Sequence, residues 1–143
     1  MCIRDRNEVD MTDIVDFVKR EEDSFLSKEG FNLTITPFII FSLAKVLNEM
    51  PELNSSLSGD LVIQHSQINM GIAVSVDGGL MVPSINNCDE KNLLGICRDL
   101  NNIVQKTRVK AINPDDLQGS TFTLSNFGAV SYTHLTLPTI YSV

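Results

Sequence analysis

The clearest pattern of polar and apolar positions lies in the middle of the chain. Over residues 68–76, apolar side chains alternate strictly with small or polar ones. A period of two is typical of a strand with one buried face. Residues 77–79, Asp-Gly-Gly, follow as a turn, and a second apolar stretch covers 80–85. The pattern predicts a hairpin. Pro83 lacks a backbone donor, so the second strand is expected to lie at an edge or to end there.

Two helices are predicted in the first third of the chain. The first begins at Asp10 or Thr12, either of which can cap it, and continues to about residue 28, before Gly30. Its apolar face is expected to hold Ile14, Phe17, Val18 and Phe25. The second helix runs from Pro37 to about residue 50, with the preceding threonine, Thr36, as its cap. It is apolar nearly all round, so we expect it to be buried on more than one side.

The remaining pattern completes a mixed fold. Residues 57–60 predict a turn, and 61–65 predict a strand. Asp89 is expected to cap a third helix that reaches about residue 108. The apolar stripe of this helix is Leu93, Ile96, Cys97, Leu100, Ile103 and Val104. A short helical turn at 113–119 and a strand at 121–125 follow. This order predicts an α/β fold, a two-layer sandwich of helices on a sheet.

Composition narrows the class of protein. The 143 residues include 18 acidic and 11 basic side chains, for a net charge of −7. We expect no nucleic-acid partner and no membrane partner, because an acidic chain repels phosphates and anionic lipid. The three cysteines form no C-x-x-C motif and no even set, which favours a reducing compartment. The expected location is the cytoplasm, or the mitochondrial matrix in a eukaryote. Cys97 is expected to be buried on its helix, whereas Cys88 is the candidate for an exposed thiol.

Ser125 is the one residue whose position alone suggests chemistry. It ends an alternating strand and precedes Asn-Phe-Gly at 126–128. A hydroxyl held by a strand beside free backbone donors suits the stabilisation of a negative oxygen. The alternative is a serine that caps the turn. The sequence shows no phosphate-binding loop, and no metal site is expected, because no ligands recur at metal-binding spacing.

The two ends differ in composition from the middle. Residues 1–6, MCIRDR, and 130–143, VSYTHLTLPTIYSV, resemble translated adapter sequence. We interpret 1–6 as a non-native leader and 130–143 as a non-native tail, and we exclude both from the fold. The alternative is that the tail forms a native C-terminal strand, which its β-branched residues would suit. The fold prediction therefore rests on residues 7–129.

Five motifs in that segment together resemble the catalytic domain of the dihydrolipoamide acyltransferase component of 2-oxoacid dehydrogenase complexes. They are NEVDMTDIVDF at 7–17, LTITPFIIFSLAKVLNEMPELNSSL at 33–57, INMGIAV at 68–74, DGGLMVPSI at 77–85 and INPDDLQGSTFTLSNFG at 112–128. The resemblance implies an incomplete chloramphenicol-acetyltransferase-like sandwich, with 7–129 as part of the catalytic domain. It also implies a homotrimer within a larger core, which works with a lipoyl domain and the dehydrogenase components of the complex.

The resemblance further implies a reaction and its residues. The reaction is acyl transfer between dihydrolipoyl-lysine and coenzyme A, with the lipoyl-lysine supplied by a lipoyl domain that this sequence does not contain. Ser125 matches the serine that stabilises the tetrahedral oxyanion. Asn126 and Thr34 match positions that line the coenzyme A pocket. Ser75, at a position that is often aspartate in the family, is the remaining candidate for substrate or coenzyme A binding.

Departures from the family pattern leave alternatives open. The D-H-R-x-x-D-G motif that carries the general-base histidine is absent, and His134 is not followed by its Arg or Asp-Gly. The chain is therefore expected to be inactive as given. Val18 stands where the family often has an arginine near the coenzyme A phosphates; Lys19 or Arg20 is the candidate substitute. Two other functions remain: a non-catalytic core or binding subunit of such a complex, and a free acetyltransferase of the chloramphenicol type.

Overall fold

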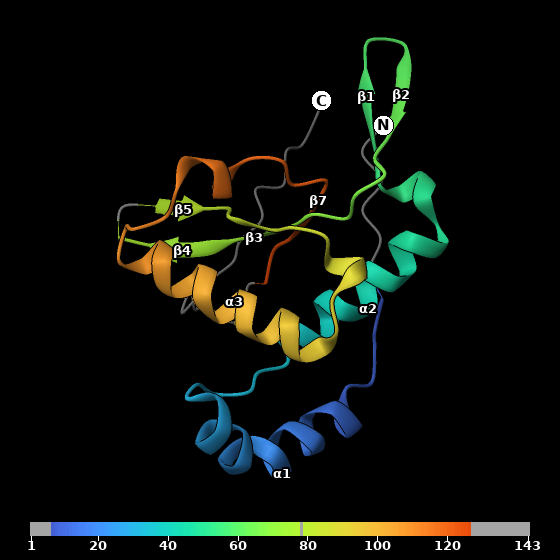
Figure 1. Cartoon of the computed structure of the whole chain (residues 1–143). Coiled ribbons are helices and arrows are strands. Elements are labelled where there is room, and N and C mark those ends of the chain that lie inside the picture. Colours follow the sequence, from blue (N-terminus) through green and yellow to red (C-terminus); the bar gives the residue numbers. More distant parts are fainter. Residues whose placement is uncertain (1–6, 78, 127–143) are drawn as a thin grey trace, which may run out of the picture.

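Burial of apolar side chains joins two helices to a small sheet. The computed structural model describes residues 7–77 and 79–126. Helices α2 (Thr36–Glu49) and α3 (Leu93–Arg108) pack on each other and lie on one side of the strands (Figure 1). Ile40, Met70 and Ile96 are fully buried where these elements meet. The expected two-layer α/β arrangement is therefore present in the described part of the chain.

The central sheet has the order β6–β3–β7. Strand β3 (Met70–Ile72) pairs antiparallel with β6 (Ser84–Ile85) and parallel with β7 (Phe122–Leu124). Strands β4 (Val74–Val76) and β5 (Gly79–Met81) form the predicted hairpin. The expected single strand at 68–76 is divided in two, because Pro83 has no N–H with which to continue the ladder. Its carbonyl still accepts a hydrogen bond from the backbone N–H of Ile72 at 2.8 Å.

A second hairpin precedes the central sheet. Strands β1 (Ser55–Ser58) and β2 (Leu61–Gln64) pair antiparallel with each other and project from the body (Figure 1). The predicted strand at 61–65 is confirmed. The expected turn at 57–60 was too long, because Leu57 and Ser58 belong to β1 and the turn consists of Gly59 and Asp60. Gly59 has φ 61°, which glycine adopts without steric cost.

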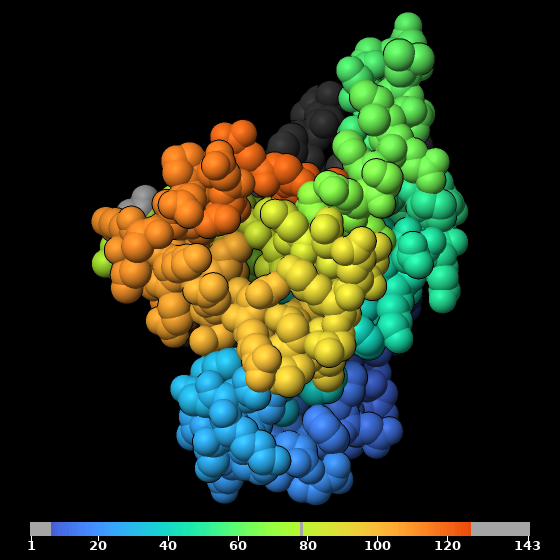
Figure 2. All heavy atoms as spheres, in the orientation of Figure 1, coloured from blue at the N-terminus to red at the C-terminus, as the bar shows by residue number. Residues whose placement is uncertain are grey.

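Helix α1 (Thr12–Glu29) has the predicted length, and Gly30 ends it with φ 78°. None of its residues is buried, and Phe17, on the predicted apolar face, is 39% exposed. The helix contacts α2 through one edge-on aromatic pair, Phe17 with Phe38, whose ring centroids lie 5.9 Å apart. In the space-filling view it protrudes below the rest of the chain (Figure 2). Asp10 accepts hydrogen bonds from the N–H and hydroxyl of Thr12 ahead of the first turn.

The expectation that α2 is buried on more than one side was wrong. Its buried residues form one stripe, made of Pro37, Ile40, Ala44 and Leu47. Val46, on another face, is 43% exposed. Thr36 is the first residue of the helix rather than its cap, and Ile35 occupies the cap position. In the described chain, α3, the strands and short connecting turns cover one side of this helix and α1 adds a single aromatic contact, which is why one stripe is enclosed.

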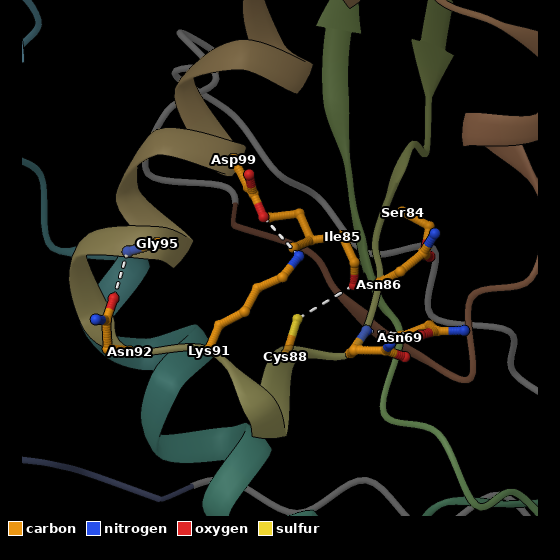
Figure 3. A network of polar contacts seen from close by, with 10 residues as sticks. Asn69, Ser84, Ile85, Asn86, Cys88, Lys91, Asn92, Gly95 and Asp99 are labelled. Carbon is orange, nitrogen blue, oxygen red and sulfur yellow. Dashed lines mark hydrogen bonds and ion pairs between the residues drawn. The ribbon is translucent and has the colours of Figure 1, made fainter.

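Helix α3 begins later than predicted. Asn92 caps it, and the Asn92 side chain accepts a hydrogen bond from the Gly95 N–H at 2.8 Å (Figure 3). Asp89 instead lies in η2 (Cys88–Glu90), a single 3₁₀ turn. Two further 3₁₀ turns are η1 (Pro51–Leu53) and η3 (Pro114–Leu117), and the latter confirms the predicted turn at 113–119.

The apolar stripe of α3 is confirmed. Ile96, Cys97, Leu100 and Ile103 are all buried. The expectation that Cys88 is exposed was wrong, because it is 1% exposed and its thiol donates a hydrogen bond to the Ile85 carbonyl at 3.2 Å (Figure 3).

One buried asparagine connects the segments around the central sheet. The Asn69 side chain donates to the Gly119 carbonyl at 3.0 Å and accepts from the Asn87 N–H at 2.9 Å. Its backbone N–H donates to the Thr121 hydroxyl at 3.1 Å, and its carbonyl accepts from the Thr121 N–H at 2.9 Å. Asn69 is 8% exposed, so these groups have little access to water. It therefore fixes the start of β7 against β3.

Replacing Asn69 by Ala should destabilise the chain by about 2 kcal/mol, because two part-buried hydrogen bonds of its side chain, to the Gly119 carbonyl and from the Asn87 N–H, are lost. Denaturant unfolding measures this loss. Asn102→Ala, which removes an exposed asparagine of α3, is the control and should change stability by less than about 0.5 kcal/mol. Equal losses in the two variants would contradict the role given to Asn69.

Candidate functional site

An open cavity of about 550 Å³ lies where α1 ends and the strands meet α3. One wall is the end of α1 and the segment after it, with Leu26, Gly30 and Phe31. The start of α2 and the β3–β4 junction close two further sides. The opposite wall is one face of α3, from Cys97 to Arg108. Four separate stretches of sequence, including the segment after β7, thus contribute to one hollow.

Three of the four residues predicted from sequence line this cavity. Thr34 lies in the extended segment before α2, Ser75 lies in β4, and Asn126 follows β7. Ser125 is not part of the lining; it is exposed and directly precedes Asn126 in the chain. The fold therefore brings together residues that lie far apart in the sequence.

The end of β7 is fixed to the start of α2. The Asn126 side-chain N–H donates to the Thr36 hydroxyl at 3.1 Å, across 90 residues of sequence. One residue beyond β3, the Ala73 N–H donates to the Leu124 carbonyl at 3.2 Å, which continues the pairing of β7 almost to Ser125. These bonds hold Ser125 on a strand end beside the cavity. Residues 127–128 of the predicted turn lie outside the described residues.

Close contact between β3 and its neighbours depends on Gly71. A Cβ added there would lie 3.1 Å from the Ser120 Cβ, 3.1 Å from the Thr123 hydroxyl and 3.2 Å from a Val82 methyl group. These contacts are tighter than ordinary van der Waals distances. Gly71 therefore allows β3 to approach β7, the strand that leads to Ser125 and Asn126.

Sequence reasoning missed the polar side of α3. Asn101, Gln105 and Arg108 line the cavity beside the apolar residues of the helix. Their spacing of four and three residues places them on one helical face. That spacing is visible in the sequence, but without the fold this face is indistinguishable from a solvated one. Arg108 gives the cavity a cationic side chain.

The two basic residues considered as substitutes near Val18 do not line the cavity. Arg20 pairs with Glu21 at 3.1 Å and lies over the Phe17 ring, 5.4 Å from its centroid. Lys19 is exposed on α1. Arg108 is therefore the basic residue that reaches this hollow from the described chain.

Two ionisable groups near the cavity have shifted pKa values. Burial raises the pKa of the Cys97 thiol, so this group is protonated at neutral pH. Hydrogen bonds from the Arg98 guanidinium lower the pKa of the Glu29 carboxyl, which is therefore ionised at neutral pH.

The histidine among the described residues, His65, lies away from the cavity. The His65 ring nitrogen Nε2 lies 3.0 Å from the Ser56 hydroxyl at the base of the β1–β2 hairpin, and His65 does not line the cavity. His134 lies outside the described residues.

Residues 7–77 and 79–126 contain neither a metal-ligand cluster nor a membrane-spanning helix. These residues contain no cluster of three or more His, Cys, Asp or Glu side chains that could hold a metal ion. Their helices are also too short or too polar to cross a membrane.

Curated relatives align with most of the length of this chain. The chain is 43% identical over 122 residues to the lipoamide acyltransferase component of the branched-chain alpha-keto acid dehydrogenase complex of Bacillus subtilis. It is 37% identical over 123 residues to the succinyltransferase component of the 2-oxoglutarate dehydrogenase complex of Staphylococcus epidermidis. Each match covers 85% of this chain and 29% of the relative. The chain thus spans less than a third of the length of these relatives.

Solved structures show the same fold. A probable dihydrolipoamide acetyltransferase of Listeria monocytogenes superposes with a TM-score of 0.83 at 37% identity, over 90% of this chain and 55% of that one. The dihydrolipoamide acetyltransferase of Azotobacter vinelandii superposes with a TM-score of 0.81 at 33% identity, over 90% and 53%. That second structure belongs to a crystallographic and enzymatic study of one serine, one histidine and one asparagine in the catalytic mechanism.

The expected chloramphenicol-acetyltransferase-like fold is thereby confirmed for the described part of the chain. The family model for the 2-oxoacid dehydrogenase acyltransferase catalytic domain matches residues 4–142. The chain therefore belongs to the acyltransferase family of the 2-oxoacid dehydrogenase complexes.

Proposed function

We propose that this chain forms the coenzyme A-binding part of a dihydrolipoamide acyltransferase. The whole protein would transfer an acyl group between dihydrolipoyl-lysine and coenzyme A. The observation that carries the proposal is the shared cavity. Thr34, Ser75 and Asn126, which were selected from the sequence as substrate or coenzyme A contacts, come from three distant segments and line one hollow of about 550 Å³. Cavities of this size hold small molecules and cofactors.

The lining of the cavity suits the chemistry of coenzyme A. Ile72, Val74 and Leu100 provide apolar surface for the pantetheine chain. Asn101, Gln105 and Asn126 carry side-chain amides, which both donate and accept hydrogen bonds and so match the two amides of that chain. Arg108 provides planar, charged donors for a phosphate group.

Ser125 is proposed as the oxyanion donor. In the reaction, a general base removes the proton from the attacking thiol, and the thiolate adds to the thioester carbonyl. The tetrahedral oxyanion would accept a hydrogen bond from the Ser125 hydroxyl until the second thiolate leaves and takes up a proton. Ser125 lies directly after β7, whose end is fixed by the Asn126–Thr36 hydrogen bond. A donor that is held in place before the reaction stabilises the developing charge without reorganisation.

The relatives support this division of roles. The Azotobacter vinelandii enzyme was studied for a serine and a histidine in its mechanism, and Ser125 matches the serine position of the family. The histidine would come from the D-H-R-x-x-D-G motif, which the present sequence does not contain.

Assembly with further copies is proposed on the same basis. One chain from the cubic core of a pyruvate dehydrogenase complex superposes on this chain with a TM-score of 0.80. The β1–β2 hairpin exposes Leu57, Leu61 and Val62, each more than 70% accessible. Exposed apolar groups of this kind mark interaction surfaces. We propose a homotrimer within such a core, served by a lipoyl domain and the dehydrogenase components of the complex.

The 143-residue chain should not accelerate acyl transfer from acyl-CoA to dihydrolipoamide, because it lacks the general-base motif. Base catalysis of this kind contributes about 10²–10⁴-fold to a rate. Release of free coenzyme A, followed over time, measures the reaction. Transfer above the uncatalysed rate would contradict this prediction.

Continuing the chain from residue 130 with the corresponding segment of the Bacillus subtilis relative should supply the base and restore activity. In that protein, Ser125→Ala should lower kcat by about 10²-fold, as expected for loss of one oxyanion donor. Ser120→Ala, an exposed serine ahead of β7, is the control and should retain kcat. An unchanged kcat in Ser125→Ala would remove this residue from the mechanism.

Arg108→Ala should weaken coenzyme A binding to the chain by about tenfold, because a charged hydrogen bond to phosphate contributes about 1.5–3 kcal/mol. Isothermal titration calorimetry measures the affinity. Lys106→Ala removes the same charge from the same helix but from a residue that does not line the cavity, so its affinity should match that of the unchanged chain. Equal affinities for the two variants would exclude Arg108 from the site.

A further inference from the structure

One ion pair joins the two walls of the cavity. The Arg98 guanidinium donates from Nε to Glu29 Oε2 at 2.7 Å and from Nη2 to Glu29 Oε1 at 2.9 Å. Glu29 ends α1 and Arg98 lies in α3, 69 residues further along the chain. Two parallel bonds fix the orientation of both groups as well as their distance. The Glu29 side chain is 15% exposed and the Arg98 side chain 58% exposed, so water reaches the pair mainly from the guanidinium side.

The wall to which Glu29 belongs has little other support. Helix α1 buries none of its residues. A second cavity, of about 210 Å³, separates α1 from α2 and α3. Leu33 and Cys97 line both cavities, and Phe25 and Phe31, whose rings are in edge-on contact, each line one of them. The open space behind the wall leaves it loosely packed, with the Phe17–Phe38 and Phe25–Phe31 ring pairs and the buried Leu33 among its apolar contacts, so the Glu29–Arg98 bonds help to set its position.

The chain turns immediately after the ion pair. Gly30 has φ 78°, and its N–H donates to the Leu26 carbonyl at 2.9 Å. Residues 31–34 then line the cavity as far as Thr34. Holding Glu29 in place therefore holds the start of the segment that carries Thr34. On the other side, Cys97 and Asn101, which neighbour Arg98 on α3, line the facing wall.

We propose that Glu29 and Arg98 are positioning residues that clamp the two walls of the cavity and so set its affinity for coenzyme A. This inference rests on the proposed function. Neither residue lines the cavity, so both act through the segments that they hold. Loss of the clamp would allow residues 26–34 to move away from α3, which widens the cavity and exposes Cys97.

The test uses the full chain and four variants. Glu29→Gln removes the charge but keeps the size of the side chain, and Arg98→Lys keeps the charge but loses the paired geometry. The double variant Glu29→Arg with Arg98→Glu exchanges the partners. Glu21→Gln is the control, because it removes a carboxylate of the same helix from the Arg20–Glu21 pair, which lies within α1. Circular dichroism is used to check that each variant is folded.

Two readouts are measured on each protein. Calorimetry gives the affinity for coenzyme A. Mass spectrometry of peptides after brief treatment with N-ethylmaleimide gives the labelling rate of Cys97, which is 3% exposed in the structure. Glu29→Gln should weaken coenzyme A binding by about tenfold and should increase the rate at which Cys97 is labelled. Arg98→Lys should change both readouts in the same direction, Glu21→Gln should change neither, and the exchanged pair should recover most of both.

The outcomes separate the clamp from the proposed function. If Glu29→Gln and Glu21→Gln give the same affinity and the same labelling rate, or if the exchanged pair behaves no better than Glu29→Gln, the clamp is overturned. If the unchanged chain binds no coenzyme A while Glu29→Gln still labels faster, the clamp stands as a property of the cavity and the proposed ligand is wrong.

Discussion

Parallel pairing of β3 with β7 is the constraint on which the rest of the structure depends. The two strands are about 50 residues apart in sequence, and no tight turn sets their register. Gly71 permits the close approach, and Asn69 anchors the chain that leads into β7. If this register changed by one residue, the side chains of β7 would exchange faces. Asn126 would then no longer face Thr36, and the cavity would lose one side.

Local pattern predicted the elements well where one face is buried. The α3 stripe follows directly from spacing, because burial on one side imposes the period, and the β4–β5 hairpin follows from the Asp-Gly-Gly sequence between two apolar stretches. The cap of α3 was misplaced because Asp89 and Asn92 are both residues that can cap a helix. In the structure Asp89 lies with the buried Cys88 in the 3₁₀ turn η2, and Asn92 stands at the start of α3. β1 was missed because Ser55–Ser58 has little β-propensity; it forms because β2 pairs with it.

The candidate site was accessible from the sequence only in part. Thr34, Ser75 and Asn126 were found through family motifs, and the fold places them around one cavity. Arg108 was not found, because nothing in its local sequence distinguishes a helix face turned to a cavity from one turned to water. The exposure of α1 could not be predicted for a related reason. Amphipathic spacing shows that a helix has an apolar face, but it does not show how much of the chain covers that face.

The β1–β2 hairpin gives the molecule an uneven distribution of stability. Among the described residues its strands pair only with each other, and an isolated two-stranded hairpin is marginally stable in water. Asn54, which donates to the His65 and Gln67 carbonyls, attaches its base to the body. If β1 and β2 separate beyond Asn54, no strand pairing of the central sheet is broken. Amide protons of the hairpin can therefore exchange with solvent through local opening, while those of β3 exchange only when the core itself unfolds.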